Sequence, residues 1–529
     1  MTGDKAGFEP LHQSAQQASS PPHPRSVGPD DPRYVDLVGR GFNKRFAGRP
    51  AYVRVATSTA DVVEAVQDAV RDKLRLAVRS GGHCLEGFVA DTAVQVIIDI
   101  SLMTNVDYDP RMRAFSVEAG ATLGEVYRKL FLGWGVVIPA GESPSIGVGG
   151  HVSGGAFGFL CREHGLAADH LFAVEVVVVD ESGTARSVVA TREASDPNRD
   201  LWWAHTGGGG GNFGVLTRCW FRSVGASGTE IPSLLLPQAP DAVLAFRAAW
   251  KWSDVDARTF TQLMRNHGDW CERNGAADSA YAKLFSTLIL YRRQSGKIEI
   301  KGLSTAGPDA ERLCDAHLAA ITQGIDAPHT REVEKTSWLS FALNPFPELF
   351  HPPGFEHASF KIKDAFLRRR FTDSQISVAY HFLTRSDHDI PGGMLGLATY
   401  GAKINTVLPH ATASAQRDSI LTTSCTVGWM DPHDEARSLA WVREFYRAMF
   451  VDTGGVPVPG ERCDGAFINH PDVDLADPDW NRSGMHWHTL YYKDNYPRLQ
   501  RIKASWDPGN VFHHALSIAA DPSSSNPSR

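Results

Sequence analysis

Three glycine-rich loops within the first 215 residues constrain the fold more than any other feature of this sequence. The first is R-S-G-G-H at 79–83, the second occupies 141–158, and the third occupies 207–214. Glycine lets a backbone approach a ligand closely and lets several N–H groups converge on one anion. One such loop alone is typical of a tight turn, whereas three in one unit indicate a long, partly buried ligand with a diphosphate at its centre.

The kind of ligand is narrowed by what the chain lacks. Neither of the first two loops is followed by G-K-[ST], as in a Walker A loop, and neither is a G-x-G-x-x-G that opens a helix behind a strand. A formal net charge of −7 argues against a protein that tracks nucleic-acid phosphates. No segment approaches the ~18–20 continuous apolar residues of a membrane span. We therefore expect a soluble protein with a small-molecule partner, and the oligomeric state stays open.

The two ends of the chain and its cysteines indicate the compartment. Residues 1–32 and 521–529 are rich in proline, serine and polar residues and are predicted to be disordered tails. The N-terminal tail has no apolar core of a secretion signal, which favours a cytoplasmic location. The seven cysteines are scattered, odd in number and without a C-x-x-C motif, which is typical of reduced thiols.

The rest of the chain divides into two regions with different patterns of predicted helices and strands. From Tyr52 to about 222, short strand-like runs alternate with helical ones, and Phe172–Asp180 is predicted to be a buried strand. Between about 225 and 459, the segments Pro240–Trp250 and Asp309–Gly324 are predicted to be long helices. They alternate with strand candidates such as Ala282–Tyr291 and Gly396–Tyr400. This pattern predicts a second, separately layered unit. Dense aromatic and glycine motifs after 469 indicate a return to the first unit.

Four motifs, in one order, resemble the berberine bridge enzyme-like oxidases of the vanillyl-alcohol-oxidase superfamily, above all their actinomycete natural-product branch. They are R-S-G-G-H at 79–83, G-V-G-G-H-V-S-G-G-A-F-G at 147–158, D-L-W-W-A-H-T-G-G-G-G-G-N-F-G-V at 200–215, and Y-Y-K-D-N-Y-P-R-L-Q-R-I-K-A-S-W-D-P-G-N-V-F at 491–512. The resemblance extends over about residues 50–518. It implies an α+β fold in which a two-part FAD-binding domain (33–224 and 461–520) receives an inserted substrate domain (225–460), built on an antiparallel sheet covered by helices.

The resemblance also implies where FAD is held. His83 matches the histidine that bonds to the 8α-methyl group of the flavin. Where some relatives have a second attachment through cysteine, this chain has Ser143, whose hydroxyl is far less acidic than a thiol. Attachment is therefore expected through His83 alone. The cofactor-binding residues implied are His83, Arg79, Ser80, Gly81, Gly82, Ser143, Gly147, Val148, Gly149, Gly150, Gly154, Gly155, Gly214, Val215, Tyr492 and Asn495.

The substrate side departs from the family pattern. Many relatives carry Y-x-N-Y, with the second tyrosine as catalytic base, where this chain has F-I-N-H at 467–470. Many also have tyrosine in place of Phe157. His470 is thus the candidate base, since imidazole titrates near pH ~6.5; alternatively it only binds substrate. Phe157 and Phe467 are expected to contact substrate, and Tyr400 is a second catalytic candidate.

His486-Trp487-His488 would place two imidazoles on one face of a strand, which is a spacing that metal ligands use. No nearby Cys, Asp or Glu motif completes a ligand set, so no metal is expected.

The function implied is that of an FAD oxidase in antibiotic biosynthesis, acting on an alcohol in the sugar or polyketide portion of a natural product. Hydride would pass to flavin N5 and O₂ would be reduced to H₂O₂, with the cofactor supplying the hard chemistry. The main alternative is other flavin chemistry on the same fold: oxidative cyclisation, oxygenation or a redox-neutral rearrangement. A third alternative is a flavoprotein that binds a small molecule without turnover.

Overall fold

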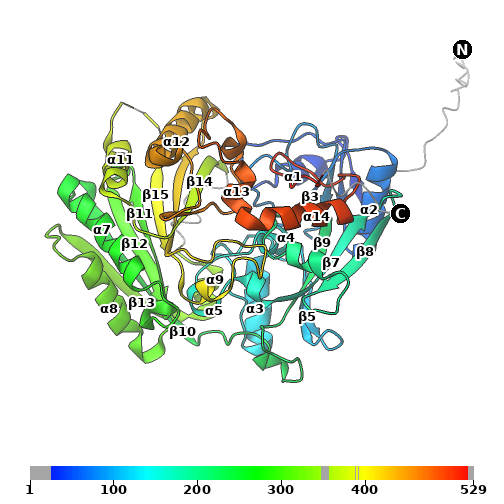
Figure 1. Ribbon diagram of the computed structural model, residues 1–529, viewed down its shortest axis with the longest axis horizontal. Coiled ribbons are helices and arrows are strands. Elements are labelled where there is room, and N and C mark those ends of the chain that lie inside the picture. Colours follow the sequence, from blue (N-terminus) through cyan, green and yellow to red (C-terminus); the bar gives the residue numbers. More distant parts are fainter. Residues whose placement is uncertain (1–24, 347–356, 388, 391, 522–529) are drawn as a thin grey trace, which may run out of the picture.

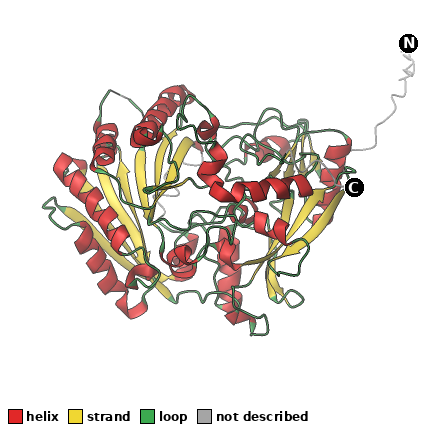
Figure 2. Cartoon of the chain, in the orientation of Figure 1, coloured by secondary structure: helices red, strands yellow, loops and turns green. Residues whose placement is uncertain are grey.

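Two units lie side by side, and the C-terminal segment crosses the junction between them (Figure 1). The computed structural model describes residues 25–346, 357–387, 389–390 and 392–521. An N-terminal unit carries two small sheets, and a central unit carries one large antiparallel sheet with helices over one face (Figure 2). This arrangement confirms the predicted α+β class with its helix-covered antiparallel sheet.

The first sheet of the N-terminal unit has the order β1-β2-β4-β3. Its strands are β1 (Ser26–Val27), β2 (Tyr52–Val55), β3 (Leu76–Arg79) and β4 (Val96–Asp99). Strands β2 and β3 both run parallel to β4, and β1 adds antiparallel to β2. Strand β1 corrects the predicted N-terminal tail, since 25–32 belong to the folded structure; residues 1–24 and 522–529 lie outside the described residues. Helices α1 (Arg33–Gly39) and α2 (Thr59–Arg71) accompany this sheet, and Ser58 caps α2 as expected.

The second sheet of this unit is antiparallel, in the order β5-β6-β9-β7-β8. Its strands are β5 (Val106–Asp109), β6 (Ala114–Glu118), β7 (Leu171–Val179), β8 (Ala185–Thr191) and β9 (Val215–Phe221). Strand β7, which lies between β9 and β8, is buried at all positions but Glu175, which confirms the predicted buried strand. The helices of this part are α3 (Leu123–Trp134), α4 (Val148–Ser153), α5 (Cys161–His164) and α6 (Arg199–Ala204).

The central unit is an eight-stranded antiparallel sheet in the order β13-β10-β12-β11-β15-β16-β14-β17. Its strands are β10 (Ala242–Lys251), β11 (Leu284–Tyr291), β12 (Lys297–Ser304), β13 (His329–Ser337), β14 (Ser359–Leu367), β15 (Met394–Thr399), β16 (Leu421–Trp429) and β17 (Cys463–Gly465). Its helices are α7 (Ala257–Arg273), α8 (Ala310–Ile321), α9 (Trp338–Leu343), α11 (Asp373–Thr384) and α12 (Glu435–Met449). Helices α7, α8, α11 and α12 cover one face, and the other face is turned toward the N-terminal unit (Figures 1 and 2).

The predicted helix at Pro240–Trp250 is wrong, because this segment forms strand β10. Its alanine-rich sequence favours a helix locally. In the structure, however, β10 pairs with β12 on one side and β13 on the other, and Phe246, Ala248 and Trp250 are buried at every second position. Pairing on both edges and burial of one face outweigh the local preference. The predicted helix at Asp309–Gly324 is confirmed as α8.

The C-terminal segment joins both units. Its strand β17 extends the large sheet beside β14. Helices α13 (Trp487–Tyr492) and α14 (Tyr496–Trp506) then return to the N-terminal unit. There the buried Lys503 Nζ donates to the carbonyl oxygen of Asn212 at 2.7 Å and that of Phe512 at 2.6 Å. This tie fixes the end of the chain against the third glycine loop.

A buried charge cluster joins three distant parts of the chain. Lys361 and Lys363, on strand β14, contact Asp472 and Asp474 of the C-terminal segment, and Lys361 also pairs with Glu86 of the N-terminal unit. Lys361 Nζ lies 2.7 Å from Asp472 Oδ1, and Lys363 Nζ lies 2.9 Å from Asp474 Oδ2. All five side chains are at most 3% exposed.

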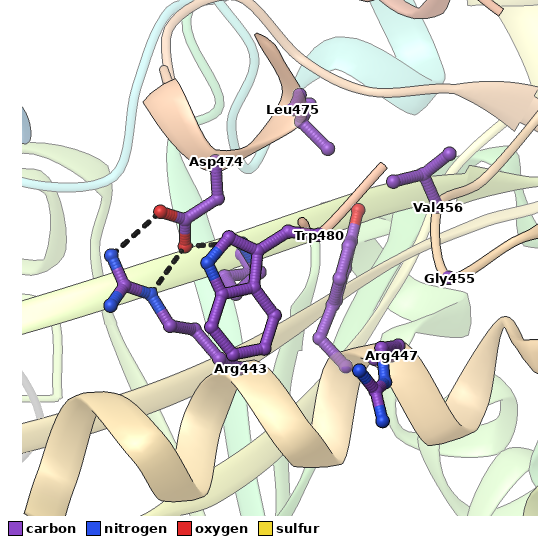
Figure 3. Close-up of a pocket in the computed structure, with 9 residues that line it drawn as sticks. Arg443, Arg447, Gly455, Val456, Asp474, Leu475 and Trp480 are labelled. Carbon is purple, nitrogen blue, oxygen red and sulfur yellow. Dashed lines mark hydrogen bonds and ion pairs between the residues drawn. The ribbon is translucent and has the colours of Figure 1, made fainter. Parts of the chain in front are cut away.

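Helix α12 contributes a further cation to this cluster. Arg443 reaches from the helix to both oxygens of Asp474, at 2.9 and 2.8 Å (Figure 3). The carboxylates therefore hold the helix layer as well as the sheet.

No helix in the described part of the chain is long and apolar enough to span a membrane.

Replacing Lys361 by methionine is expected to lower the free energy of unfolding by about 3–5 kcal/mol, because Glu86 and Asp472 would stay buried without their shared cation. Urea-induced unfolding would measure the loss. Lys335→Met is the matched control, since Lys335 is exposed on the edge strand β13, and a surface change is expected to stay within about 0.5 kcal/mol. Equal losses in the two variants would contradict a structural role for the cluster.

Candidate active site

The first two glycine loops pack backbone against backbone. A Cβ atom on Gly81 would overlap the backbone of Gly147, and one on Gly147 would overlap Gly81 and the Ser80 side chain. Ser80 Oγ in turn donates to the Ala119 carbonyl oxygen at 2.6 Å. Gly82 has a left-handed backbone, with φ of +77°, beside the Arg40 carbonyl. These residues are small because the loops must touch.

Part of the second and third loops borders open space. Gly150 is exposed, and a Cβ atom placed there would have no atom within 4 Å. Gly210 of the third loop is also exposed, and a Cβ atom placed on it would lie 3.8 Å from the Cα atom of Gly150. The N–H groups of Val148 and Gly149 donate to the carbonyls of residues 121 and 119, each at 2.9 Å, and so fix the start of α4. The exposed backbone at Gly150 and Gly210, called the cradle below, is accessible to a ligand.

At other predicted cofactor residues, the side-chain position faces protein. A Cβ atom on Gly154 would overlap the Asn469 amide, and one on Gly155 would overlap the Ser414 hydroxyl. Gly214 lies against the Val177 carbonyl, and Val215 pairs with Val177 in the sheet. These glycines make room for the central unit and the C-terminal segment to close over the N-terminal unit.

Three predicted polar residues anchor the loops from behind. Arg79 is buried, with Nη2 2.7 Å from Asp99 Oδ2. Tyr492 donates to the Gly208 carbonyl at 3.0 Å, and the Asn495 amide donates to the Pro409 carbonyl at 2.8 Å. The side chains of these residues position the loops rather than face the cradle.

His83 is held in one orientation at the edge of the loops. Its ring stacks on Phe42, with centroids 4.2 Å apart and an angle of 14° between the planes. Its Nε2 atom lies 2.9 Å from Ser145 Oγ, which is 3.0 Å from Ser143 Oγ. Burial raises the pKa of the neighbouring Cys84 thiol to about 11, so that thiol is not a competing nucleophile.

The structure brings the predicted substrate-side residues together. Phe157 and Phe366 each lie 4.9 Å, between ring centroids, from Tyr400. Phe366 is 5.7 Å from Phe467, which is 5.4 Å from His470. These rings form an aromatic wall between the two units, and His470 stands at its end.

Tyr400 is a poor candidate for a base. Its side chain is buried, and its hydroxyl donates to the Gln416 carbonyl at 3.1 Å. Burial raises its pKa far above the usual range of a phenol. The Tyr400 ring thus packs within the aromatic wall.

Sequence reasoning missed Asp364, which stands behind His470. Asp364 lies on β14, and its Oδ2 atom is 3.3 Å from His470 Nδ1. The available signal was the single acidic residue in the otherwise apolar and basic run S-F-K-I-K-D-A-F-L at 359–367.

Two more ionisable groups, Glu142 and His151, surround His470 and were also missed. Burial raises the pKa of the Glu142 carboxyl to about 7, although the positive charges of His470 and Lys301 oppose this shift. Burial lowers the pKa of His151 to about 3, and repulsion from His470 and His83 adds to the effect. His151 is therefore neutral at neutral pH, whereas Glu142 changes its charge there.

The expectation of a strand at His486-Trp487-His488 is wrong, because these residues begin helix α13. The rings of His486 and His488 stack at 5.3 Å, and His488 also stacks on Tyr496 at 3.7 Å. Within the described ranges, no group of three or more His, Cys, Asp or Glu side chains is arranged to hold a metal ion.

Comparison with known proteins identifies the family. The family described as "FAD binding domain" matches residues 50–188, and that described as "Berberine and berberine like" matches residues 466–519. Aclacinomycin-N/aclacinomycin-A oxidase from Streptomyces galilaeus is 52% identical over 490 residues, which cover 92% of this chain and 88% of that protein.

Solved structures agree with this similarity. The crystal structure of aclacinomycin oxidoreductase has a TM-score of 0.91 at 50% identity and covers 94% of this chain and 99% of its own. A glycopeptide hexose oxidase complexed with teicoplanin has a TM-score of 0.89 at 47% identity, with coverage of 95% and 100%. Together with the cradle, the His83 loop and the fold, these findings show that the chain belongs to the berberine bridge enzyme-like family of FAD-linked oxidases.

Proposed function

We propose that this protein oxidises an alcohol in the sugar or polyketide portion of a natural product, with FAD as cofactor and O₂ as electron acceptor. The observation that carries the proposal is the position of His470, a partly exposed imidazole at the end of an aromatic wall and backed by a buried carboxylate. The substrate class is supported by the relatives, which are named as an aclacinomycin oxidase and a glycopeptide hexose oxidase.

FAD is held by the cradle and attached through His83 alone. The exposed backbone at Gly150 and Gly210 suits the diphosphate, and the stacked ring of His83 offers a fixed imidazole as nucleophile. Ser143 and Ser145 supply hydroxyls beside that ring. A hydroxyl is much less acidic than a thiol, so neither serine provides the anionic nucleophile that a second bond needs.

His470 accepts the proton of the substrate hydroxyl. When bound, FAD supplies the acceptor for the carbinol hydride and returns the electrons to O₂. The half-buried Phe157 and Phe467 offer apolar surface that orients a ring-bearing substrate and excludes water, and the buried Phe366 supports them from behind. His151 and Tyr400 do not compete as bases, since the first is held neutral with a low pKa and the second has a buried, hydrogen-bonded hydroxyl.

The ratio of H₂O₂ formed to alcohol consumed distinguishes this proposal from other flavin chemistry on the same fold. One H₂O₂ formed for each alcohol converted to a carbonyl supports the oxidase. Incorporation of oxygen from ¹⁸O₂ into the product, or turnover without O₂ consumption, would replace it with oxygenation or a redox-neutral rearrangement.

The variant His83→Ala is expected to lose covalent FAD, because the serine hydroxyls beside the ring are weakly acidic and the Cys84 thiol has a raised pKa. Intact mass of the denatured protein would show one FAD on the parent and none on the variant. Ser143→Ala is the matched control and is expected to keep the mass of one FAD. Retention of FAD mass by denatured His83→Ala protein would refute the attachment.

The variant His470→Ala is expected to slow anaerobic flavin reduction by about 10²–10⁴-fold, the range typical of a lost general base. Substrate binding, followed by the perturbation of the flavin spectrum, should weaken much less. Stopped-flow absorbance measures both quantities. His381→Ala, on the exposed surface of α11, is the control and should reduce at the parent rate, whereas normal reduction by His470→Ala would remove His470 from the mechanism.

The variant Glu142→Gln is expected to change how stability depends on pH. The folded state keeps a proton on Glu142 up to about pH 7, while an unfolded glutamate releases it near 4.5. The stabilisation by this group is therefore complete below about pH 4.5 and is lost as pH rises through about 7. Relative to the parent, the variant should gain in melting temperature from pH 5 to pH 8. Glu311→Gln, on the exposed face of α8, should show no such trend, and a flat difference for Glu142→Gln would contradict the assignment.

A further inference from the structure

We propose that Asp364 is a positioning residue that fixes the ring and the tautomer of His470. In this arrangement Nδ1–H of His470 points to Asp364, and Nε2 presents its lone pair to the cleft. The inference deepens the proposed function, because it rests on His470 as the proton acceptor.

One carboxylate holds both the ring and the turn that carries it. Asp364 Oδ2 lies 3.3 Å from His470 Nδ1, and Asp364 Oδ1 accepts a hydrogen bond from the Phe467 N–H at 3.2 Å. The turn is closed by the His470 N–H, which donates to the Phe467 carbonyl oxygen at 2.9 Å. The ring of His470 is therefore fixed relative to its own backbone.

The side chains of Asp364 and His470 differ sharply in their exposure to solvent. The side chain of Asp364 is 2% exposed, whereas that of His470 is 37% exposed. Asp364 Oδ2 and His470 Nδ1 are both buried, and within the described chain neither has a partner with full hydrogen-bond geometry, so their 3.3 Å ion-pair contact is the nearest pairing open to both. The buried Nδ1 side of the ring thus faces one acceptor, and a neutral imidazole that donates from Nδ1 must keep its acceptor lone pair on Nε2.

Asp364 stands on a rigid support. It lies in the middle of β14, opposite Ser424 of β16, and its carbonyl oxygen accepts a hydrogen bond from the Tyr446 hydroxyl at 2.6 Å. Its neighbours Lys361 and Lys363 belong to the buried charge cluster. A group that is held on a strand in this way can set the position of a mobile turn.

Asp364, when ionised, places a buried negative charge directly behind the imidazole. Burial raises the pKa of Asp364 and Asp472 adds to this, whereas His470 lowers it through a hydrogen bond and its positive charge. No Lys or Arg in the described residues forms an ion pair with Asp364. Glu142 and His151 face His470, and Asp472, Tyr446 and Tyr491 lie around Asp364. When His470 accepts a proton, its charge is therefore compensated by Asp364.

The test is Asp364→Asn in the FAD-loaded enzyme. Flavin reduction is expected to slow by about 10–100-fold, as is typical when a supporting partner of a functional histidine is lost, with substrate affinity nearly unchanged. The lower limb of the pH profile should move to lower pH, because imidazolium is less stabilised without the carboxylate. In a His470→Ala background the same change should have almost no further effect.

A structural control separates positioning from simple destabilisation. Asp464→Asn removes another fully buried carboxylate, which pairs with Arg368 and Lys493 at 2.7 and 2.6 Å. It should lower the melting temperature and leave the pH profile of reduction in place. An Asp364→Asn enzyme with the parent rate and pH profile would overturn the proposal, as would full additivity with His470→Ala.

A tautomer measurement keeps this inference distinct from the proposed function. ¹⁵N-histidine NMR of the FAD-loaded protein, with the His470 signals assigned by their loss in His470→Ala, should show the Nδ1–H tautomer in the parent and a mixture in Asp364→Asn. This result stands even if His470→Ala reduces the flavin normally, in which case only the role of His470 as base fails. An Nε2–H tautomer in the parent would overturn the positioning role.

Discussion

The buried charge cluster around Lys361 is the constraint on which the site depends. Glu86 follows His83 by three residues, Asp472 follows His470 by two, and Lys363 directly precedes Asp364. Each part of the chain that brings a functional group to the junction therefore also brings a charge to the cluster. The ion pairs bring the loop of His83, the turn of His470 and the strand of Asp364 to one place, although these segments are far apart in the sequence.

Such a cluster is better understood as a source of specificity than of stability. Removing five charges from water is costly, and apolar side chains of similar size often stabilise a fold as well or better. An apolar contact, however, tolerates sliding, whereas the two lysines on alternate positions of β14 meet carboxylates in one register only. The placement of Asp364 between the units requires that register.

The sequence indicated the glycine loops and the aromatic side chains of this site, but not the carboxylate behind His470. The glycine loops, the strand before His83 and the cap at Ser58 depend on local patterns that survive in the fold. The segment at Pro240–Trp250 was misread because its strand pairing comes from distant partners, and His486-Trp487-His488 because a short helix has little periodicity. Asp364 had no local signal that tied it to His470. At Gly154 and Gly155 the sequence did not indicate the close contacts with Asn469 and Ser414, which lie far along the chain.

Replacing a phenol by an imidazole changes what the rest of the site must provide. A phenol that acts as base is used as an anion, so cations must lower its pKa, whereas an imidazole is neutral when it accepts a proton and needs an anion to stabilise the product. The groups around His470 are those that an imidazole base requires. Asp364 lies behind the ring, Glu142 is close enough to interact with its charge, and His151 is neutral. Phe157 and Phe467 bring no second hydroxyl, so in the proposed mechanism the imidazole is the group that receives the proton taken from substrate. A histidine in this position and carboxyl groups around it therefore belong together, because the carboxylates would stabilise the imidazolium that proton transfer forms.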